Sequence, residues 1–262
     1  MEGDASLMRP YIKDAFPDAV IVDCSRYCDL LVIMAGKEDI AKILEETSAR
    51  ELVIVVNACV YGREGEMLSE ETPLKPTGMY ARALVAAEQV SVAWAQKDVG
   101  RRLTVLRVPV IMGKGVGGEI LTLFRMSASG RYVHLRGNNS RRSLVMADDV
   151  AAAVRGLHAI GGIYNVADGR NPLLYEIATA MAANAGAEKK PITLPASWAR
   201  VIAKCLKVLH IPAAPLDYAL SEESSRSLTL DNSKIRRTLG CEFFDTIEVM
   251  ARRDKTYPYR DI

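Results

Sequence analysis

The feature that most constrains the fold is an alternation of short aliphatic runs with longer segments of helical periodicity. Runs rich in Val, Ile and Leu are expected to be strands at Asp29–Gly36, Glu51–Asn57 and Arg102–Gly113. Helical patterns from about Glu38 to Ser48 and from about Thr77 to Lys97 separate them. Near-continuous apolar strands with intervening helices are typical of a parallel sheet that is buried on both faces. The sequence therefore predicts an α/β fold with a Rossmann-like, doubly wound parallel sheet.

The second half of the chain has a different order of expected elements, which begins with glycine-rich turns after Gly113. The elements expected there are helices near Gly118–Ser129, Ala147–His158 and Leu174–Ala185 and strands at Tyr132–Leu135 and Ile163–Val166. One further strand is expected near the start of the chain, at Asp18–Asp23. A chain of 262 residues is long enough for one large domain with a small appended lobe.

Composition argues against several classes of function. The 34 basic and 32 acidic side chains give a net charge of +2, so no overall field favours nucleic acid or membranes. Five scattered cysteines indicate free thiols in a reducing cytosol, and Cys24 and Cys28 lack the second pair or nearby histidine of a zinc site. We expect no signal peptide before the fold, and no apolar run approaches ~18 residues. We therefore expect a cytoplasmic protein with no metal site, no nucleic-acid partner and no membrane span.

The segment Leu194–Leu209 is amphipathic. Its apolar residues recur at helical spacing, at Trp198, Val201, Ile202, Cys205 and Leu209. We interpret this face as core or dimer surface rather than as a membrane anchor, because the polar face lacks a lysine-rich stripe.

One tyrosine lies where chemistry could occur. Tyr80 opens a predicted helix that follows Pro73 and Pro76. An unperturbed tyrosine has a pKa near ~10 and is a poor proton shuttle unless a cation favours the phenolate. The efficient position for that cation is four residues later, on the same helix face, and here it holds Leu84.

Several motifs follow one another in order along the chain. They are Asn57-Ala-Cys-Val-Tyr-Gly62, Tyr80-Ala-Arg-Ala-Leu84, Leu106-Arg-Val-Pro-Val-Ile-Met-Gly113, Arg142-Ser-Leu-Val-Met-Ala-Asp-Asp-Val150, Gly162-Ile-Tyr-Asn-Val166 and Leu230-Asp-Asn-Ser-Lys-Ile-Arg-Arg-Thr-Leu-Gly240. In these motifs the chain resembles the extended short-chain dehydrogenase/reductase family, the NAD(P)-dependent nucleotide-sugar epimerases and dehydratases. The resemblance covers most of the chain. It implies a truncated dinucleotide-binding part at residues 1–113 and a mainly substrate-binding lobe at 114–262, with some segments returning to the main sheet.

The resemblance also implies catalytic roles. Tyr80 takes the position of the family's catalytic tyrosine, while Asn57 and Leu84 stand where the family has Ser/Thr and Lys. Asn57 can still donate a hydrogen bond to a substrate oxygen, but Leu84 supplies no charge. Losing a positioned acid–base group typically costs ~10²–10⁴-fold in rate. We therefore expect an epimerase/dehydratase-like protein with impaired or no catalysis; the alternative is an active epimerase, dehydratase or 4-keto reductase that uses Tyr80.

The expected cofactor is NAD or NADP. By resemblance, the residues that would bind it are Gly3, Asp23, Ala35, Gly36, Tyr80 and Pro109. Gly3 would be the remnant of a glycine-rich turn and Asp23 the acid that meets the adenosine ribose. The alternatives are that Gly3 is a flexible terminal residue and that Asp23 is an ordinary acid at the end of a strand. Ala35 and Gly36 are small enough to permit close approach of the cofactor.

The expected ligand and assembly follow from the same resemblance. Arg142 would reach the diphosphate of a nucleotide sugar, a task that suits a bidentate guanidinium. The alternative is a surface arginine paired with Asp148 or Asp149. A homodimer, or a complex with a partner enzyme, is expected. Its candidate surface lies on the predicted helices at 38–48 and 77–97 and includes Met79, Val85, Val92 and Trp94.

Overall fold

The computed structural model describes residues 3–17, 28–36, 39–113, 118–187 and 190–252. Its centre is a four-stranded parallel sheet in the order β1-β2-β4-β8. The strands are β1 (Leu30–Met34), β2 (Glu51–Asn57), β4 (Arg102–Val108) and β8 (Gly162–Asn165). The predicted α/β class with a parallel sheet is thus confirmed, and the predicted bounds of β2 agree with the structure. The strand expected at Asp18–Asp23 lies outside the described residues.

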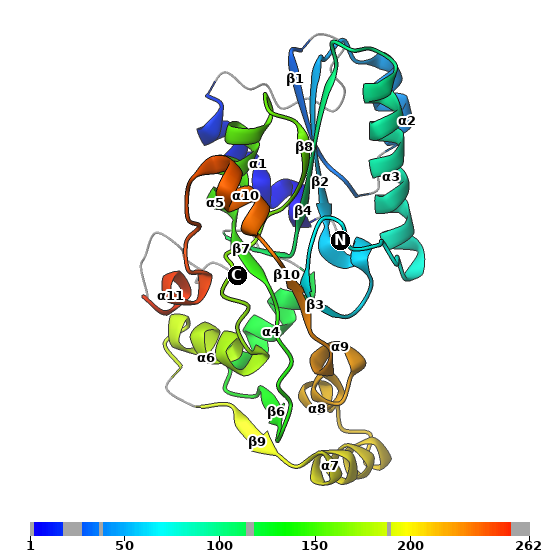
Figure 1. The fold of residues 1–262 in the computed structure, drawn as a ribbon. Coiled ribbons are helices and arrows are strands. Elements are labelled where there is room, and N and C mark those ends of the chain that lie inside the picture. Colours follow the sequence, from blue (N-terminus) through cyan, green and yellow to red (C-terminus); the bar gives the residue numbers. More distant parts are fainter. Residues whose placement is uncertain (1–2, 18–27, 37–38, 114–117, 188–189, 253–262) are drawn as a thin grey trace.

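Helices cover both faces of this sheet (Figure 1). On one face lie α2 (Ile40–Glu46) and α3 (Gly78–Gln96), and on the other lie α1 (Gly3–Ala15) and α5 (Ala147–Leu157). Side chains of β2 pack alternately against the two helical layers, because successive strand residues point to opposite faces. Leu52, Ile54 and Val56 join the apolar cluster under α2 and α3, whereas Val53 and Val55 join the cluster under α1 and α5.

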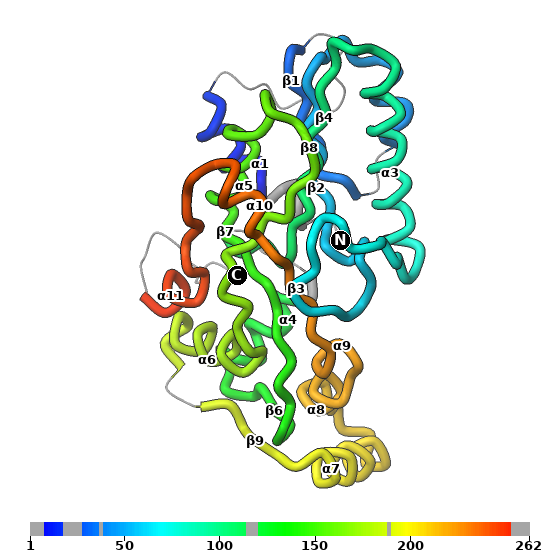
Figure 2. The backbone as a smooth tube through the Cα atoms, viewed as in Figure 1, coloured from blue at the N-terminus to red at the C-terminus, as the bar shows by residue number. Residues whose placement is uncertain are grey.

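Most of the remaining elements extend the molecule beyond the carboxyl ends of the strands, whereas α10 (Ser233–Leu239) lies beside α5 and β8 (Figure 1). The other helices are α4 (Gly118–Ala128), α6 (Leu174–Asn184), α7 (Ala196–Val208), α8 (Ala214–Ala219), α9 (Glu222–Ser225) and α11 (Thr246–Ala251), with the 3₁₀ turn η1 (Ala58–Tyr61). Parallel two-stranded pairs join β5 (Val110–Met112) to β7 (Leu144–Met146), β6 (Val133–Leu135) to β9 (Ile192–Leu194), and β3 (Gly65–Leu68) to β10 (Leu228–Leu230). Figure 2 shows how the last pair brings a late segment of the chain beside an early one.

The start of the chain differs from the expected glycine turn. The backbone is helical from Gly3 to Ala15, and Met8 is buried against the sheet. A helix anchored by a buried side chain at this point leaves no turn between Gly3 and Arg9. Gly3 therefore lies at the beginning of a helix rather than in a loop, and Asp23 lies outside the described residues.

The amphipathic segment was expected to be core or dimer surface, and only part of its apolar face belongs to the core. In α7, Ala199 is fully buried, but Trp198 is 67% exposed and Val201 63% exposed. The helix is apolar over a wider arc than its neighbours cover, so only the inner part of the arc belongs to the core.

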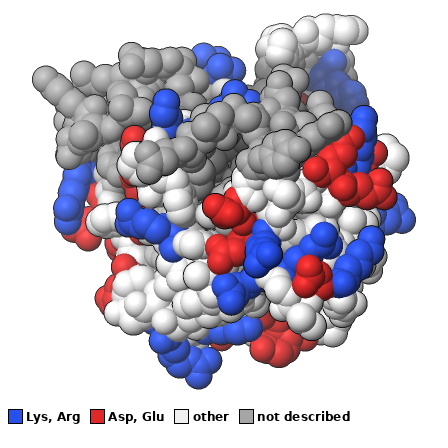
Figure 3. Space-filling model, turned by 90° about the horizontal axis from the view of Figure 1, so that it is seen from above, with Lys and Arg blue, Asp and Glu red and all other residues white. Residues whose placement is uncertain are grey.

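The charged surface is mixed. On the face shown in Figure 3, basic and acidic side chains of the described residues are interspersed, as the near-zero net charge predicts. Within the described ranges, no helix combines the length and apolar character needed to cross a bilayer. Nor do three His, Cys, Asp or Glu side chains of the described chain gather closely enough to hold a metal ion.

Candidate active site

The strand register brings most of the predicted site residues to one edge of the sheet. Met34 of β1 pairs with Val55, and Asn57 at the end of β2 pairs with Val108 at the end of β4. Ala35, Gly36 and Pro109 follow these strand ends directly, at the carboxyl edge. In open α/β sheets, ligands bind in the crevice outside that edge. The structure thus places Ala35, Gly36, Asn57 and Pro109 at one edge of the sheet, the edge where a ligand of this fold would bind.

Tyr80 lies in the first turn of α3, above the same edge. Gly78 begins the helix with φ of +82°, a conformation that L side chains rarely adopt. That turn delivers Tyr80 half-buried against the cluster beneath α3. Helix α3 also contacts η1, the short turn that starts directly after Asn57. Tyr80 and Asn57 therefore come from neighbouring elements.

Leu84 lies one turn further along α3 and points into the core. Its side chain has no exposed surface and belongs to the apolar cluster between α3 and the sheet. A charged group in such surroundings is strongly disfavoured unless it is paired. The position that would hold the activating cation is built as an apolar packing site.

Asn57 has a local structural task. Its Oδ1 accepts the backbone N–H of Cys59 at 2.9 Å and so caps the 3₁₀ turn. Burial raises the pKa of the Cys59 thiol to about 11, with a backbone hydrogen bond lowering it in part. At neutral pH Cys59 is therefore a neutral thiol and not a nucleophile. The oxygen of Asn57 is occupied, which leaves its amide nitrogen as the group that can face a ligand.

A buried polar network lies beneath this edge, and the sequence analysis did not predict it. Arg107 on β4 forms two hydrogen bonds to Glu88 of α3, at 3.0 and 2.8 Å. Its Nη1 also donates to the Tyr61 hydroxyl at 3.0 Å, and that hydroxyl donates to Asn165 Oδ1 on β8 at 2.8 Å. All four residues are at most 5% exposed. The network joins α3, η1, β4 and β8 near the carboxyl edge of the sheet.

The network holds the loop after η1 as well. Asn165 donates its backbone N–H to Glu70 Oε1 and its side-chain amide to the Leu68 carbonyl, both at 2.8 Å. Burial raises the pKa of Tyr61, although hydrogen bonding and charge from Arg107 oppose the shift. Tyr61 is thus a neutral, fixed hydroxyl. In the sequence, the residues of this network were visible only as members of motifs shared with the family, and nothing indicated that they contact one another.

Arg142 lies away from the strand edge, in the lobe beyond it. Its guanidinium donates to the backbone carbonyls of Arg226 and Glu223. It also lines a small, largely apolar cavity of about 50 Å³ with Val110, Ile120, Leu123, Leu144, Ile177 and Tyr218. Arg142 therefore ties the segment before β10 to the lobe, and its role toward a diphosphate remains a prediction.

Asp149, which is buried, and Asp168, which is half-buried, form a second polar site beside α11. Asp149 accepts the Phe244 backbone N–H at 3.1 Å, and Asp168 accepts that of Thr246 at 3.3 Å. Burial raises the pKa of Asp149 to about 7; the Phe244 N–H opposes the shift, and the charges of Asp148 and Asp168 add to it. This pair anchors the segment that leads into α11.

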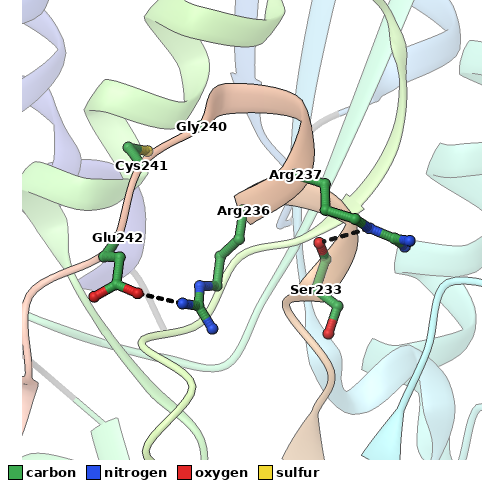
Figure 4. A pocket seen from close by; sticks show the side chains of 6 residues that line it. All are labelled: Ser233, Arg236, Arg237, Gly240, Cys241 and Glu242. Carbon is green, nitrogen blue, oxygen red and sulfur yellow. Dashed lines mark hydrogen bonds and ion pairs between the residues drawn. The ribbon is translucent and has the colours of Figure 1, made fainter.

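A shallow surface hollow lies along α10 (Figure 4). It is lined by Ser233, Arg236, Arg237, Gly240, Cys241 and Glu242. Arg236 forms an ion pair with Glu242, and Arg237 donates to the Ser233 carbonyl at 3.2 Å within the same helix. Both guanidinium groups have local partners, so we assign no ligand to this hollow.

Comparisons with known proteins agree with this architecture. The model of the NAD dependent epimerase/dehydratase family matches residues 30–167. A curated relative is 23% identical over 132 residues: the N-acetyl-α-D-glucosaminyl-diphospho-ditrans,octacis-undecaprenol 4-epimerase of Escherichia coli O157:H7. The match covers 50% of this chain and 39% of the relative, so it spans well under half of that protein.

Two solved structures illustrate the likeness in fold. UDP-glucose 4-epimerase of Thermotoga maritima, with UDP-glucose, gives a TM-score of 0.62 at 18% identity. The match covers 86% of this chain and 75% of the epimerase chain. RMD of Pseudomonas aeruginosa, with NADPH, gives a TM-score of 0.64 at 16% identity. The match covers 94% of this chain and 93% of the RMD chain. At such identities the likeness shows the fold alone.

Proposed function

Because this chain belongs to the NAD-dependent epimerase/dehydratase family, whose model spans residues 30–167 of 262, we propose that it binds a nucleotide sugar with impaired or no catalysis. The family supplies the scaffold and the ligand class. The individual residues decide what chemistry is left.

The observation that carries the proposal is the environment of Leu84. This residue lies one helical turn after Tyr80, on the same face of α3, and is completely buried among apolar side chains. In the family a lysine at this position lowers the pKa of the tyrosine. An aliphatic side chain that is part of the core cannot do so, and the loss of such a group lowers turnover by ~10²–10⁴-fold.

Binding is favoured by the features that the strand edge retains. Ala35 and Gly36 are small residues after β1, and Pro109 is a compact residue after β4, so their side chains would permit close approach of a dinucleotide. NAD or NADP would supply a nicotinamide that exchanges hydride with the sugar. Asn57 would donate its side-chain N–H to a sugar oxygen. The relatives with UDP-glucose and NADPH support these ligand classes.

An active enzyme is the second candidate function. Tyr80 remains half-buried at the strand edge beside the turn that Asn57 caps. The E. coli relative is an epimerase. In this alternative, Tyr80 exchanges the substrate's hydroxyl proton without help from position 84, at a rate reduced by the missing cation.

Calorimetry and a turnover assay separate these functions. The chain is titrated with NAD+, NADP+, UDP-glucose and UDP-N-acetylglucosamine, and each sugar nucleotide is then incubated with enzyme and cofactor. A ligand at ~100 times its Kd should stabilise the fold by roughly 2.7 kcal/mol. We expect such stabilisation by a sugar nucleotide with no turnover.

A matched pair of tyrosine variants identifies the source of any activity. If the chain turns over substrate, and Tyr80→Phe abolishes this activity while Tyr175→Phe leaves it unchanged, the chain is an active enzyme that uses Tyr80. Tyr175 lies on α6, outside the strand edge. Absence of binding by all four ligands would refute the proposed function itself.

A further inference from the structure

Helix α7 carries an apolar strip that no other described part of the chain covers. Ala199 is fully buried, and Ile202 and Leu206 pack partly against the small cluster around α8 and β6. At 100° per residue, the neighbouring sector of the helix holds another apolar group. Its members are Trp198, Val201, Val208 and Leu209, which are 63–70% exposed, with Cys205 exposed between them and Ile211, 48% exposed, just beyond the helix.

The charge around this strip is strongly one-sided. From Lys190 to Leu216 the sequence contains no Asp or Glu, although the chain as a whole is almost neutral. Arg200, Lys204 and Lys207 are exposed on the polar side of α7. Within the described chain, none of these three forms an ion pair. These three side chains give the strip a cationic edge. This observation revises the interpretation of the helix from its sequence alone, which found no lysine-rich stripe and favoured core or dimer surface over a membrane anchor.

The position of the helix suits contact with an extended surface. Figure 1 shows α7 at the extremity of the molecule, remote from the central sheet. We propose that α7 docks on an anionic membrane surface, with Trp198, Val201, Val208 and Leu209 in the headgroup boundary and the cationic side chains on lipid phosphates. Apolar residues including Trp on one face, with Lys and Arg on the other, are the properties of helices that lie in the membrane interface.

A second copy of the chain fits this strip less well. A symmetric dimer would place the cationic edge of one helix near that of the other, which is repulsive. A single three-turn helix also offers much less than the ~800 Å² per partner of a stable interface. A membrane, by contrast, provides both hydrocarbon and negative charge.

This inference goes beyond the proposed function and does not depend on catalysis. It would bring the lobe beyond the strand edge close to a bilayer. The E. coli relative acts on an undecaprenol-linked sugar diphosphate, so a docked position would suit a substrate that is held in a lipid layer.

The test is sedimentation of the whole chain with vesicles of phosphatidylglycerol and phosphatidylethanolamine, compared with phosphatidylcholine vesicles. The chain has two tryptophans, and Trp94 is buried. A blue shift of emission on adding vesicles therefore reports Trp198. We expect partition into the anionic vesicles, weakened by salt, with this blue shift.

Variants of exposed residues make the test specific. Trp198→Ser with Val201→Ser should weaken partition about 100-fold, at about tenfold for each apolar side chain. Lys204→Glu with Lys207→Glu should remove the preference for anionic vesicles. Val99→Ser, at an exposed apolar residue in the turn before β4, is the matched control and should have no effect.

Three results would overturn the proposal. They are no partition of the wild type into either vesicle, partition that the Trp198 and Val201 substitutions leave unchanged, and a concentration-dependent dimer that those substitutions disperse while vesicles bind nothing. Thermal unfolding of each variant confirms that it remains folded.

Discussion

Replacing Leu84 by lysine tests whether the apolar packing at this position is incompatible with the cation that the chemistry needs. Leu84 has no exposed surface in the cluster beneath α3. Burial can lower a lysine pKa by up to 3–5 units, so a lysine here with a ~4-unit shift would have a pKa near ~6.4 and be mostly neutral at pH 7. Linkage then gives a loss of about 4.5 kcal/mol in the free energy of unfolding at pH 7.

Urea denaturation of Leu84→Lys against Leu84→Met measures this loss. The methionine variant conserves volume and should lose less than about 1.5 kcal/mol. A lysine pKa that is lower in the folded state means that the unfolded state binds more protons between about pH 6 and pH 10. The deficit of Leu84→Lys should therefore shrink as the pH rises toward 10.

Equal stability of the two variants at pH 7 would refute the reasoning, because it would show that the ammonium group reaches solvent or the crevice. The activity of the combined variant is a separate readout. Leu84→Lys with Asn57→Ser should not restore turnover, because a buried lysine that is mostly neutral at pH 7 cannot favour the Tyr80 phenolate. Substantial turnover of the double variant would show that a lysine at position 84 reaches the Tyr80 hydroxyl as a cation.

Three further predictions concern stability. Glu88→Gln leaves the Arg107 guanidinium buried without its counterion and should cost about 3–5 kcal/mol in urea denaturation; replacing both partners, with Glu88→Leu and Arg107→Met, should recover part of that loss. The Asp149 pKa of about 7 exceeds its ordinary value of 3.8, so the folded state binds the extra proton and wild-type stability should fall as the pH rises from about 4 to about 7, by at most about 4 kcal/mol. Asp149→Asn, which can still accept the Phe244 N–H, should abolish that fall, and an unchanged pH profile would contradict the assignment. Gly78→Ala meets no neighbouring atom but must adopt φ of +82°, so it should cost about 1 kcal/mol in thermal unfolding through backbone strain alone.

The main elements could be predicted from the sequence because their signals are local. The apolar run of β2 and the helical pattern of α3 gave bounds within a residue of those observed. Continuous aliphatic strands separated by helices require a parallel sheet, since only that arrangement buries both faces. The break at Pro109 was not predicted, because the apolar run of Arg102–Gly113 continues through it; in the structure β4 ends at Val108 and β5 begins at Val110.

Other features depended on contacts between distant residues. Nothing in the spacing of Tyr61, Glu88, Arg107 and Asn165 indicates one hydrogen-bonded network, because four separate elements must meet to form it. The outward strip of α7 was likewise beyond the sequence, since periodicity gives the width of an apolar arc but not how much of it the neighbours cover. The sequence by itself determined that a tyrosine is followed one helical turn later by a leucine and not by a cation. Only the tertiary structure decided that position 84 faces the core, because burial depends on how elements pack and not on a single helix.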